Sequence, residues 1–395
     1  MSTPPALIVF SHLRWRFVVQ RPQHLLSRLS RRYRVLFVEE PVHDPAAEPT
    51  LQVESTDCPR VTVLRLASRL SERGFDDAAL ALLEPLLARY LAQARLVRCV
   101  AWFYTPMAVP LLAGLAPLAV VYDCMDELAA FKAAPQAMRA REAQLLRQAH
   151  LVLTGGPGLY EAKRRAHGNV HCLPSSVDAA HYTASAQRRR GPQWQAGAAL
   201  QRGLPRPRLG FFGVIDERLD LDLLAALARQ RPQWQLVMVG PVCKRDESEL
   251  PRAPNLHWLG QQPYERLPAL VHGWDVCLLP FALNEHTRFI SPTKTLEYLA
   301  AGKPVVGTPL RDVMTLYGDV VELASSADEF IARCEAVLAR TPDQRARHRR
   351  EAARTVARYS WDAAAARVQA LLDGLLQPEV PVPAALPHGL VPGVA

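Results

Sequence analysis

The sequence predicts an α/β protein built from two domains, each with a doubly wound parallel sheet. Apolar runs of strand length alternate with amphipathic stretches of helix length in both halves of the chain. Most of these runs are continuously apolar, which is typical of strands that helices cover on both faces. The 395 residues are enough for two cores. We expect a cleft between them, with ligands bound beyond the carboxyl ends of the strands.

The first domain is expected to span residues 1–182. Its predicted strands are residues 7–10, 35–39, 61–66, 97–104, 119–123 and 151–154, and its clearest helices are residues 22–32 and 76–94. Residues 183–207 follow. From residue 187 onward they hold Arg, Gln, Gly and Pro in loose order, so we interpret this stretch as a linker.

The second domain is expected to span residues 208–360. Its predicted strands are residues 209–215, 236–239, 256–259, 276–280 and 304–307, and its helices are residues 222–230, 292–301, 327–340 and 343–359. A last helix is expected over residues 361–377, with Ser360 as its N-cap. The tail, residues 378–395, is rich in Pro, Val and Gly and is expected to be disordered.

Cysteine content, hydropathy and charge argue against several classes of protein. The seven cysteines are odd in number, widely spaced and free of any CxxC pair, which argues against a disulfide framework and against a zinc site. No apolar run reaches the roughly 18 residues of a membrane span. The N-terminus lacks the pattern of a secretory signal, so we expect a cytoplasmic protein. The net charge is +9, but no nucleic-acid-binding motif accompanies it, so we expect no nucleic-acid partner.

One basic stretch stands out near the start of the chain. Residues 13–38 contain seven arginines and no acidic residue. A face of this kind attracts anionic partners, and the alternative interpretation is a solvated helix surface. We expect six of the arginines to dock the first domain on an anionic membrane face: Arg14, Arg16, Arg21, Arg28, Arg31 and Arg32.

The loops that follow the strands hold few general phosphate-binding motifs. No GxxxxGK[ST] is present, so a P-loop nucleoside triphosphatase is unsupported. The loop after the first strand has no GxGxxG, which disfavours a dinucleotide site. Gly155, Gly156 and Gly158 follow a strand and open a helix. This turn is either an anion site at a helix N-terminus or a structural turn.

The segment from Ser291 to Glu297 carries the strongest chemical signal. Ser291 is expected to cap a helix, and Pro292 fits its first turn. The backbone N–H groups of Thr293 and Lys294 would then face the cleft, where the Lys294 ammonium adds a charge that suits a diphosphate. Glu297 lies on the same helix face as Lys294, and its carboxylate can accept both hydroxyls of a ribose. A helix cap with a surface ion pair is the alternative.

The pattern Ser-Pro-x-Lys-x-x-Glu-Tyr-Leu-Ala-x-Gly-Lys-Pro-Val-Val over residues 291–306 resembles the donor-site helix of GT-B glycosyltransferases, close to glycosyltransferase family 4. This chain also resembles the donor half of these enzymes in four further segments, which follow one another in the same order. They are residues 210–215, 236–241, 255–268 and 359–362. The sequence Gln-Arg-Pro-Gln-His-Leu at residues 20–25 is similar to a subgroup seen in bacterial cell-surface polysaccharide synthesis. The resemblance covers about residues 7–376.

The resemblance implies a GT-B enzyme with two Rossmann-like domains facing across a cleft. Such an enzyme would move a sugar from a nucleotide-diphosphate sugar to a carbohydrate or lipid-linked acceptor, with retention of the anomeric configuration. We expect no metal ion and no cofactor, because cationic side chains would stabilise the leaving phosphate. The implied donor-binding residues are Gly213, Arg218, Arg288, Ser291, Pro292, Thr293, Lys294 and Glu297.

The sequence departs from the family pattern in two places. The loop at residues 216–220 carries Arg218 but lacks the lysine that the family favours there, and Lys294 could supply that second positive charge. The other departure concerns a glutamate. Family 4 usually carries two glutamates separated by seven residues. Glu297 matches the second, but Phe289 stands at the first. Asn284, Glu285 or Arg288 could contact the donor sugar instead. Two alternatives stay open: a nucleotide-sugar epimerase of the same fold and, because of Phe289, a non-catalytic glycosyltransferase-like binding protein.

An inverting enzyme would need an acid or base from the first domain. The candidates there are His12, His24, Asp123 and Asp126. Asp126 comes just after a predicted strand and is expected to point into the cleft. The catalytic set that we expect is therefore Asp126 and His24, together with Arg218 and Lys294 of the second domain. A structural role for His24 and a helix cap at Asp123 are the alternatives.

Overall fold

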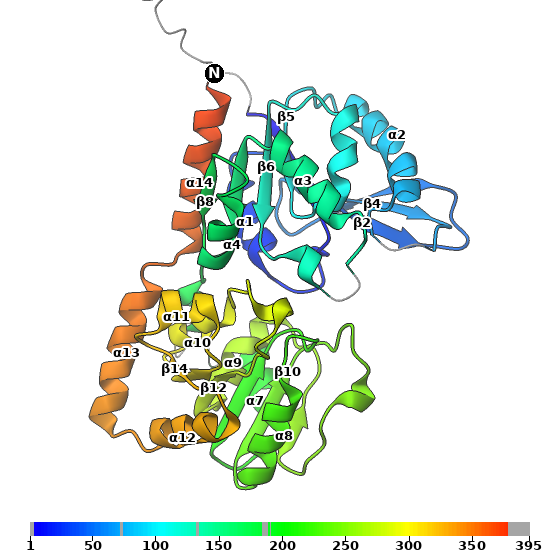
Figure 1. Cartoon of the computed structure of the whole chain (residues 1–395). Coiled ribbons are helices and arrows are strands. Elements are labelled where there is room, and N and C mark those ends of the chain that lie inside the picture. Colours follow the sequence, from blue (N-terminus) through cyan, green and yellow to red (C-terminus); the bar gives the residue numbers. More distant parts are fainter. Residues whose placement is uncertain (1–3, 72–73, 132–133, 184–188, 190, 378–395) are drawn as a thin grey trace, which may run out of the picture.

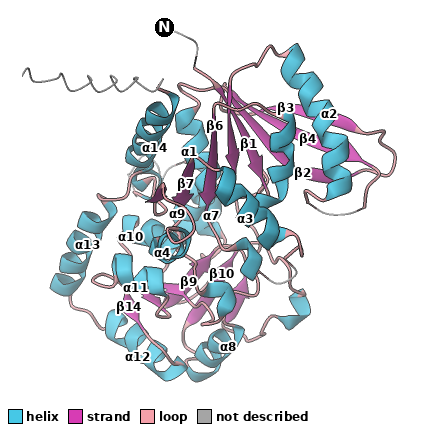
Figure 2. Cartoon of the chain, turned by 45° about the horizontal axis from the view of Figure 1, so that its top comes forward, coloured by secondary structure: helices cyan, strands magenta, loops and turns pink. Residues whose placement is uncertain are grey.

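The computed structural model describes residues 4–71, 74–131, 134–183, 189 and 191–377. It contains two domains, each with a mainly parallel sheet covered by helices, which confirms the predicted fold class (Figures 1 and 2). The tail that is expected to be disordered, residues 378–395, lies outside the described residues. None of the helices in the described part of the chain combines the length and the apolar character needed to cross a bilayer.

The first sheet has the strand order β3-β4-β2-β1-β5-β6-β7-β8. All neighbouring strands are parallel except β3, which pairs antiparallel with β4 at the edge. The strands are β1 (Ala6–Ser11), β2 (Val35–His43), β3 (Thr50–Ser55), β4 (Val61–Ser68), β5 (Cys99–Phe103), β6 (Ala119–Cys124), β7 (Leu151–Thr154) and β8 (Val170–Cys172). The sequence did not predict β3 and β8, because β3 is mostly exposed and polar and β8 has only three, partly buried residues, so neither forms an apolar run.

Helices cover both faces of the first sheet. They are α1 (Arg21–Leu29), α2 (Asp77–Gln93), η1 (Pro106–Gly114), η2 (Leu128–Ala130), α3 (Met138–Gln148), α4 (Pro157–Lys163) and α5 (Ala179–Tyr182), where η marks a 3-10 helix. Ile8 and Phe10 of β1 belong to the core beneath α2 and α3, whereas Leu7 and Val9 belong to the core beneath α1. This alternation of faces explains why the strand is apolar throughout.

The second sheet is parallel throughout, with the order β11-β10-β9-β12-β13-β14. Its strands are β9 (Arg208–Phe212), β10 (Gln235–Val239), β11 (Leu256–Trp258), β12 (Val276–Leu279), β13 (Val305–Gly307) and β14 (Glu322–Leu323). The longer helices are α7 (Pro192–Ala199), α8 (Leu221–Gln230), α9 (Leu267–Gly273), α10 (Lys294–Ala300), α11 (Arg311–Tyr317), α12 (Ala327–Leu338), α13 (Pro342–Val356) and α14 (Trp361–Leu376). Three short 3-10 helices complete the domain: η3 (Glu247–Glu249), η4 (Tyr264–Arg266) and η5 (Glu285–Thr287).

The segment that we interpreted as a loose linker contains an ordered helix, α7. This helix packs against α9, and a Cβ added to Gly197 would lie 2.7 Å from the backbone oxygen of Arg266. The buried side-chain amide of Gln201 donates to the backbone oxygen of Leu270 at 2.9 Å. Helix α7 packs closely through small residues such as Gly197, and these residues form no periodic hydrophobic pattern. Hydrophobic periodicity therefore did not reveal the helix. Residues 184–188 and 190 of the same stretch lie outside the described residues.

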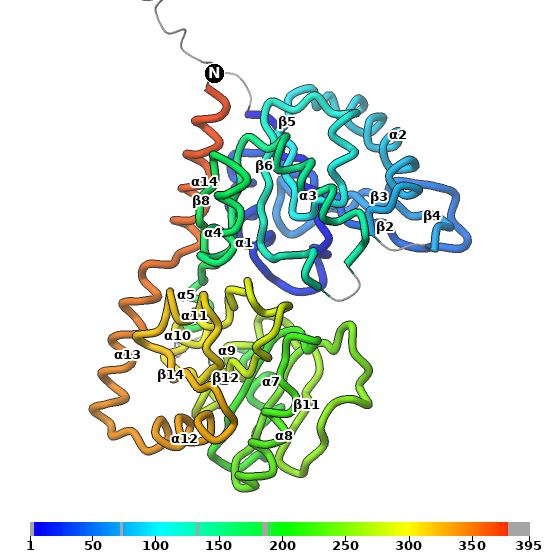
Figure 3. The backbone as a smooth tube through the Cα atoms, viewed as in Figure 1, coloured from blue at the N-terminus to red at the C-terminus, as the bar shows by residue number. Residues whose placement is uncertain are grey.

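The last helix returns to the first domain (Figures 1 and 3). The backbone turns at the end of α13, and α14 then runs beside α1. Trp361, Val368 and Leu372 are buried in the first-domain core that also holds Leu25 of α1. The predicted N-cap is confirmed, since the Ser360 hydroxyl accepts a hydrogen bond from the backbone N–H of Asp362.

The glycine-rich turn before α4 is a contact point between the domains. The backbone N–H of Gly158 donates to Asp312 Oδ1 of α11 at 2.8 Å. A Cβ on Gly156 would lie 1.9 Å from Asp312 Oδ2, so only glycine lets the two elements approach this closely. Of the two interpretations of this turn, the structure favours the structural one.

Candidate functional site

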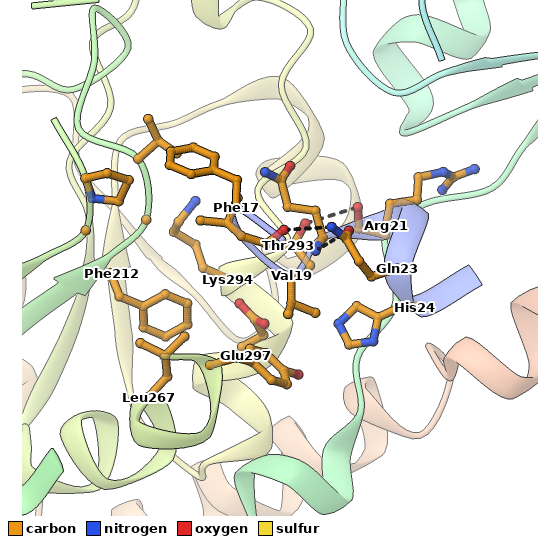
Figure 4. A pocket seen from close by; sticks show the side chains of 18 of the residues that line it. Phe17, Val19, Arg21, Gln23, His24, Phe212, Leu267, Thr293, Lys294 and Glu297 are labelled. Atoms are coloured by element: carbon orange, nitrogen blue, oxygen red, sulfur yellow. Dashed lines mark hydrogen bonds between the residues drawn. The ribbon is translucent and has the colours of Figure 1, made fainter. Parts of the chain in front are cut away.

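A cavity of about 900 Å³ lies between the two domains. Its walls come from loops that follow β1, β6 and β7 of the first sheet and β9, β10 and β12 of the second. In Figure 4, Lys294 and Glu297 lie on one side of this cavity, and Gln23 and His24 lie on the other. Carboxyl ends of parallel strands are where doubly wound domains bind ligands. This cavity is therefore the candidate active site.

Nine of the ten predicted catalytic and donor-binding residues line this cavity. They are His24, Asp126, Gly213, Arg218, Ser291, Pro292, Thr293, Lys294 and Glu297. Arg288 is not among the lining residues. Its side chain is 64% exposed, lies 3.8 Å from Glu285 and stacks over the ring of Phe289. The expected contact between Arg288 and a donor is therefore not supported by its position.

Lys294 is the first residue of α10 and is partly buried in the cavity wall. Its Nζ lies 5.4 Å from the ring centre of Phe211 and 5.3 Å from that of Phe281. Gly213 makes room for it, because a Cβ there would lie 2.7 Å from Lys294 Cε. Burial lowers the pKa of Lys294, the nearby Arg218 charge lowers it further, and the Glu297 carboxylate opposes both effects. An anionic ligand would relieve the cost of keeping this ammonium charged.

Arg218 is held more tightly than the sequence suggested. Its guanidinium binds the carboxylate of Asp216 through two bonds, Nε to Oδ1 at 3.0 Å and Nη2 to Oδ2 at 2.7 Å. Across the cleft, the ring of Phe131 lies 5.5 Å from its central carbon. Within the described residues, Nη1 makes no hydrogen bond. Asp216 thus fixes the guanidinium in place and leaves one edge of it for a ligand.

Glu297 lies beneath Lys294 and is 8% exposed. The hydroxyl of Tyr182, which is fully buried at the end of α5, donates to Glu297 Oε1 at 2.9 Å. Burial raises the pKa of Glu297, while the Tyr182 hydrogen bond and the Lys294 charge lower it. Tyr182 fixes one carboxylate oxygen, so the other is available to a ligand in the cavity.

The start of α10 differs from its prediction. The helix begins at Lys294, and Ser291 makes no capping bond. Backbone bonds from Thr295 to Pro292 and from Leu296 to Thr293 close a tight first turn instead. The Thr293 hydroxyl donates to the Ser175 hydroxyl of the first domain at 3.3 Å. Because α10 has only seven residues, the Lys294 ammonium matters more here than the helix dipole.

The side chains of residues 20–25 shape the first-domain wall of the cavity. The Gln23 amide donates to the backbone oxygens of Trp15 at 2.9 Å and Val18 at 3.0 Å, which holds the loop before α1. His24 stacks on Trp361 with ring centres 5.1 Å apart, and burial lowers its pKa to about 4. His24 is therefore neutral near pH 7. Its packing on Trp361 matches the structural role that we kept as an alternative.

Two further first-domain candidates differ in position. Asp123 is fully buried and bound to Arg21, with Arg21 Nη2 2.8 Å from Asp123 Oδ1, so it does not reach the cavity. His12 is not a lining residue either. Burial lowers its pKa to about 4, and the charge of Asp126 opposes that shift. Of the two aspartates among the first-domain candidates, Asp126 is therefore the one that lines the cavity.

The six N-terminal arginines do not form the free basic face that the sequence predicted. Arg21 is buried against Asp123. The other five have acidic partners as follows: Arg14 with Glu39, Arg16 with Glu54, Arg28 and Arg31 with Asp362, and Arg32 with Asp373. The local sequence did not reveal these partners, because the acids lie on other elements of the fold, two of them on α14.

Phe289 replaces the expected glutamate with an apolar contact. It is partly buried against the first-domain core and does not line the cavity. Sequence reasoning also missed Asp216, Tyr182 and Phe131. Asp216 stands two residues before Arg218, a spacing that could have indicated a guanidinium clamp. In the described residues, no three His, Cys, Asp or Glu side chains gather closely enough to hold a metal ion.

Comparisons of the sequence and of the fold with known proteins point to glycosyltransferases. A family model described as "Glycosyl transferase-like" matches residues 218–373. TuaH of Bacillus subtilis (strain 168), whose name assigns it to teichuronic acid biosynthesis as a glycosyltransferase, is 29% identical over 295 residues, which cover 69% of this chain and 72% of TuaH.

Among solved structures, the fold matches sucrose-phosphate synthase from Thermosynechococcus elongatus with a TM-score of 0.73 and 17% identity, covering 94% of this chain and 99% of that one. It also matches HepE of Anabaena in complex with UDP and glucose, with a TM-score of 0.67 and 17% identity, covering 94% of this chain and 100% of that one. Because the sequence identity is only 17%, these two matches establish the fold alone.

Proposed function

Because the chain is a glycosyltransferase with the GT-B fold, we propose that it moves a sugar from a nucleoside-diphosphate sugar to a carbohydrate or lipid-linked acceptor in cell-surface polysaccharide synthesis. The observation that carries this proposal is the meeting of Arg218 and Lys294 in one interdomain cavity. Teichuronic acid synthesis, the process in the name of the relative TuaH, supports a polysaccharide product.

The two cations suit the bond that breaks. When the bond between the anomeric carbon and the diphosphate oxygen opens, negative charge grows on the leaving phosphate. Arg218, held by Asp216, and the partly buried Lys294 are already in place to stabilise that charge. Preorganised donors of this kind contribute several kcal/mol in a site that excludes water. The two side chains take the part that a metal ion plays in other transferases, so we propose a metal-independent reaction.

The other side chains divide between donor and acceptor. Glu297, with one oxygen held by Tyr182, would bind the ribose hydroxyls of the donor. Asp126 reaches the cavity from the first domain and would orient the acceptor hydroxyl. Retention of configuration is our proposal for the outcome, because it lets the leaving phosphate accept the acceptor proton. HepE has been solved with UDP-glucose, which makes UDP sugars the first donors to test.

We leave a membrane contact through the N-terminal arginines out of this proposal, because each of the six already has an acidic partner within the protein. One observation favours a second candidate function. Phe289 packs on the first domain where the family pattern has a glutamate, which would suit a protein that binds a donor without turning it over. Turnover of the donor separates the two functions.

The test is thermal stability of the protein against nucleoside diphosphates and nucleotide sugars, without added metal. A ligand at about 100 times its dissociation constant adds roughly 2.7 kcal/mol to the free energy of unfolding. We expect one nucleotide to raise the melting temperature, and we expect Lys294→Ala and Glu297→Ala to abolish that rise.

Arg288→Ala is the matched control, because it removes a cation of the same loop that does not line the cavity. A rise that survives Lys294→Ala, or one that Arg288→Ala also abolishes, would contradict the site. Release of nucleoside diphosphate from the stabilising nucleotide sugar then decides between transfer and binding alone.

A further inference from the structure

A second cavity lies at the other end of the second sheet, away from the donor site. It has a volume of about 200 Å³. Residues that precede β12 and β13 form its floor, and the end of α12 and the first half of α13 form its sides. It therefore lies at the amino ends of these strands, whereas the donor cavity lies at their carboxyl ends. Helix α10 connects the two, with Lys294 at its start and Gly302 and Lys303 just beyond its end.

Cationic side chains dominate the lining of this second cavity. They are Lys303, Arg340, Arg345 and Arg349, and His348 lies among them. Burial lowers the pKa of His348, and its Nε2 lies 3.3 Å from the backbone oxygen of Lys303. Trp274, Pro304, Val337 and Leu338 supply apolar walls. The cavity is thus a small basic pocket with a partly apolar lining.

Most of this positive charge is unmatched within the protein. Asp275 is the one carboxylate among the lining residues, and Arg206 and the backbone N–H of Arg208 already occupy both of its oxygens. Lys303 Nζ donates to two backbone oxygens, those of His272 at 2.9 Å and Trp274 at 2.7 Å. In the part of the chain that the structure describes, no ion pair joins Lys303, Arg345 or Arg349 to an acid.

Arg340 and Arg345 are partly held in place. Arg340 binds Glu322, and Arg345 Nη2 donates to the backbone oxygen of Leu338 at 3.0 Å. The stem of Arg349 packs beside Gly302, with Arg349 Cδ 3.5 Å from where a Cβ on that glycine would lie. Each guanidinium keeps further N–H groups for a ligand, and guanidinium groups bind phosphate oxygens in pairs.

We propose that this pocket binds a phosphate group, carried either by a small anion or by a lipid headgroup. Its volume corresponds to roughly seven water molecules of liquid, which is enough for one or two phosphate groups and too little for a nucleotide sugar. A phosphate there would match the charges of Lys303, Arg345 and Arg349, which the protein itself leaves unmatched.

The first test is calorimetric titration of the full chain with inorganic pyrophosphate at constant ionic strength. In Arg345→Gln/Arg349→Gln, we expect the dissociation constant to rise at least tenfold. Arg350→Gln/Arg354→Gln is the matched control, since it removes the same charge from exposed positions of α13 outside the pocket. Its dissociation constant should stay within twofold of wild type. Equal weakening in both variants would show diffuse attraction to the helix and overturn the proposal.

Lys294→Ala, titrated in parallel, separates the pocket from the donor cavity. Binding that is lost in Lys294→Ala and unchanged in Arg345→Gln/Arg349→Gln belongs to the donor cavity and also overturns the proposal. Sedimentation with vesicles that contain phosphatidic acid identifies the source of the phosphate. Vesicle binding that pyrophosphate displaces, and that the pocket variant lacks, assigns a lipid headgroup. Pyrophosphate binding without vesicle binding assigns a small anion.

Discussion

The buried ion pair between Arg21 and Asp123 gives the sharpest prediction about stability. Arg21 begins α1, and its side chain is 2% exposed; Asp123, near the end of β6, is fully buried. The guanidinium binds Asp123 Oδ1 through Nε at 3.0 Å and also donates from Nη1 to the backbone oxygen of Leu173 at 2.6 Å. We expect Asp123→Asn, which keeps the shape and removes the charge, to destabilise the first domain strongly.

The expected loss of stability follows from the burial of both charged groups. Neither charge has contact with water, so removing one leaves the other without a counter-charge in a medium of low dielectric constant. Breaking such a buried pair costs about 3–5 kcal/mol, out of the roughly 5–15 kcal/mol that holds a typical domain together. Arg21→Met should cost a similar amount, because it leaves the Asp123 carboxylate unpaired. The double variant Arg21→Met/Asp123→Asn removes both charges and should cost less than the sum of the two single variants.

Native-state hydrogen exchange measures this cost separately in each domain. Peptides from β1 and β6 should lose protection in the single variants, and peptides from β9 and β12 of the second domain serve as the internal control. A coupling of about 2 kcal/mol between the two substitutions is expected, within the usual range for residues in contact. Single variants that cost less than about 1 kcal/mol, or costs that simply add, would refute the reasoning.

Three more predictions concern other parts of the fold. Burial raises the pKa of Asp312 to about 6 from 3.8, so the folded state takes up a proton between pH 6 and 4 that the unfolded state does not. This group therefore contributes stability that is lost as pH rises through that window, and the difference between wild type and Asp312→Asn in urea titrations at pH 4.5 and 7 should show it. Gly213→Ala should displace Lys294 and weaken nucleotide binding at least tenfold in calorimetry, since the added Cβ would meet Lys294 Cε at 2.7 Å. Trp361→Ala should cost about 3–5 kcal/mol in urea unfolding, because this buried ring packs in the first-domain core.

Each of these has a result that would contradict it. An Asp312→Asn protein with the same pH dependence as wild type would show that the carboxylate keeps an ordinary pKa when folded. Nucleotide binding that survives Gly213→Ala would mean that Lys294 has room to move without loss of the ligand. For Trp361→Ala, a loss of stability confined to second-domain peptides in hydrogen exchange would contradict the assignment of α14 to the first domain.

The sequence predicted the fold class and the local arrangement around Lys294, because both rest on short-range patterns. Continuous apolar runs indicated the buried strands. The three-residue spacing of Lys294 and Glu297 places both side chains on one helix face. The expected cap at Ser291 was wrong, since the first turn of α10 closes through backbone bonds from later residues.

Long-range pairing is what the sequence could not show. Arg28 and Arg32 are matched by Asp362 and Asp373, more than 330 residues away along the chain. Nothing near the arginines indicates these partners, so a stretch without acids looked like a free basic face. In the same way, the hydrogen bond from Tyr182 to Glu297 spans 115 residues and joins the end of the first half to the interdomain cavity. Such pairs exist only once the topology is known.

The return of α14 to the first domain has a consequence for how the protein is made. The first domain is discontinuous in sequence: its strands and α1 come from residues 6–172, but Trp361, Val368 and Leu372 complete one of its cores. During synthesis, domains usually fold as they emerge, starting from the N-terminus. Here the domain that is translated first is completed only by α14, the last helix of the described chain, so the second domain can finish folding before the first. A late nonsense mutation before Trp361 would therefore damage the first domain, although the rest of that domain was translated long before the mutated codon.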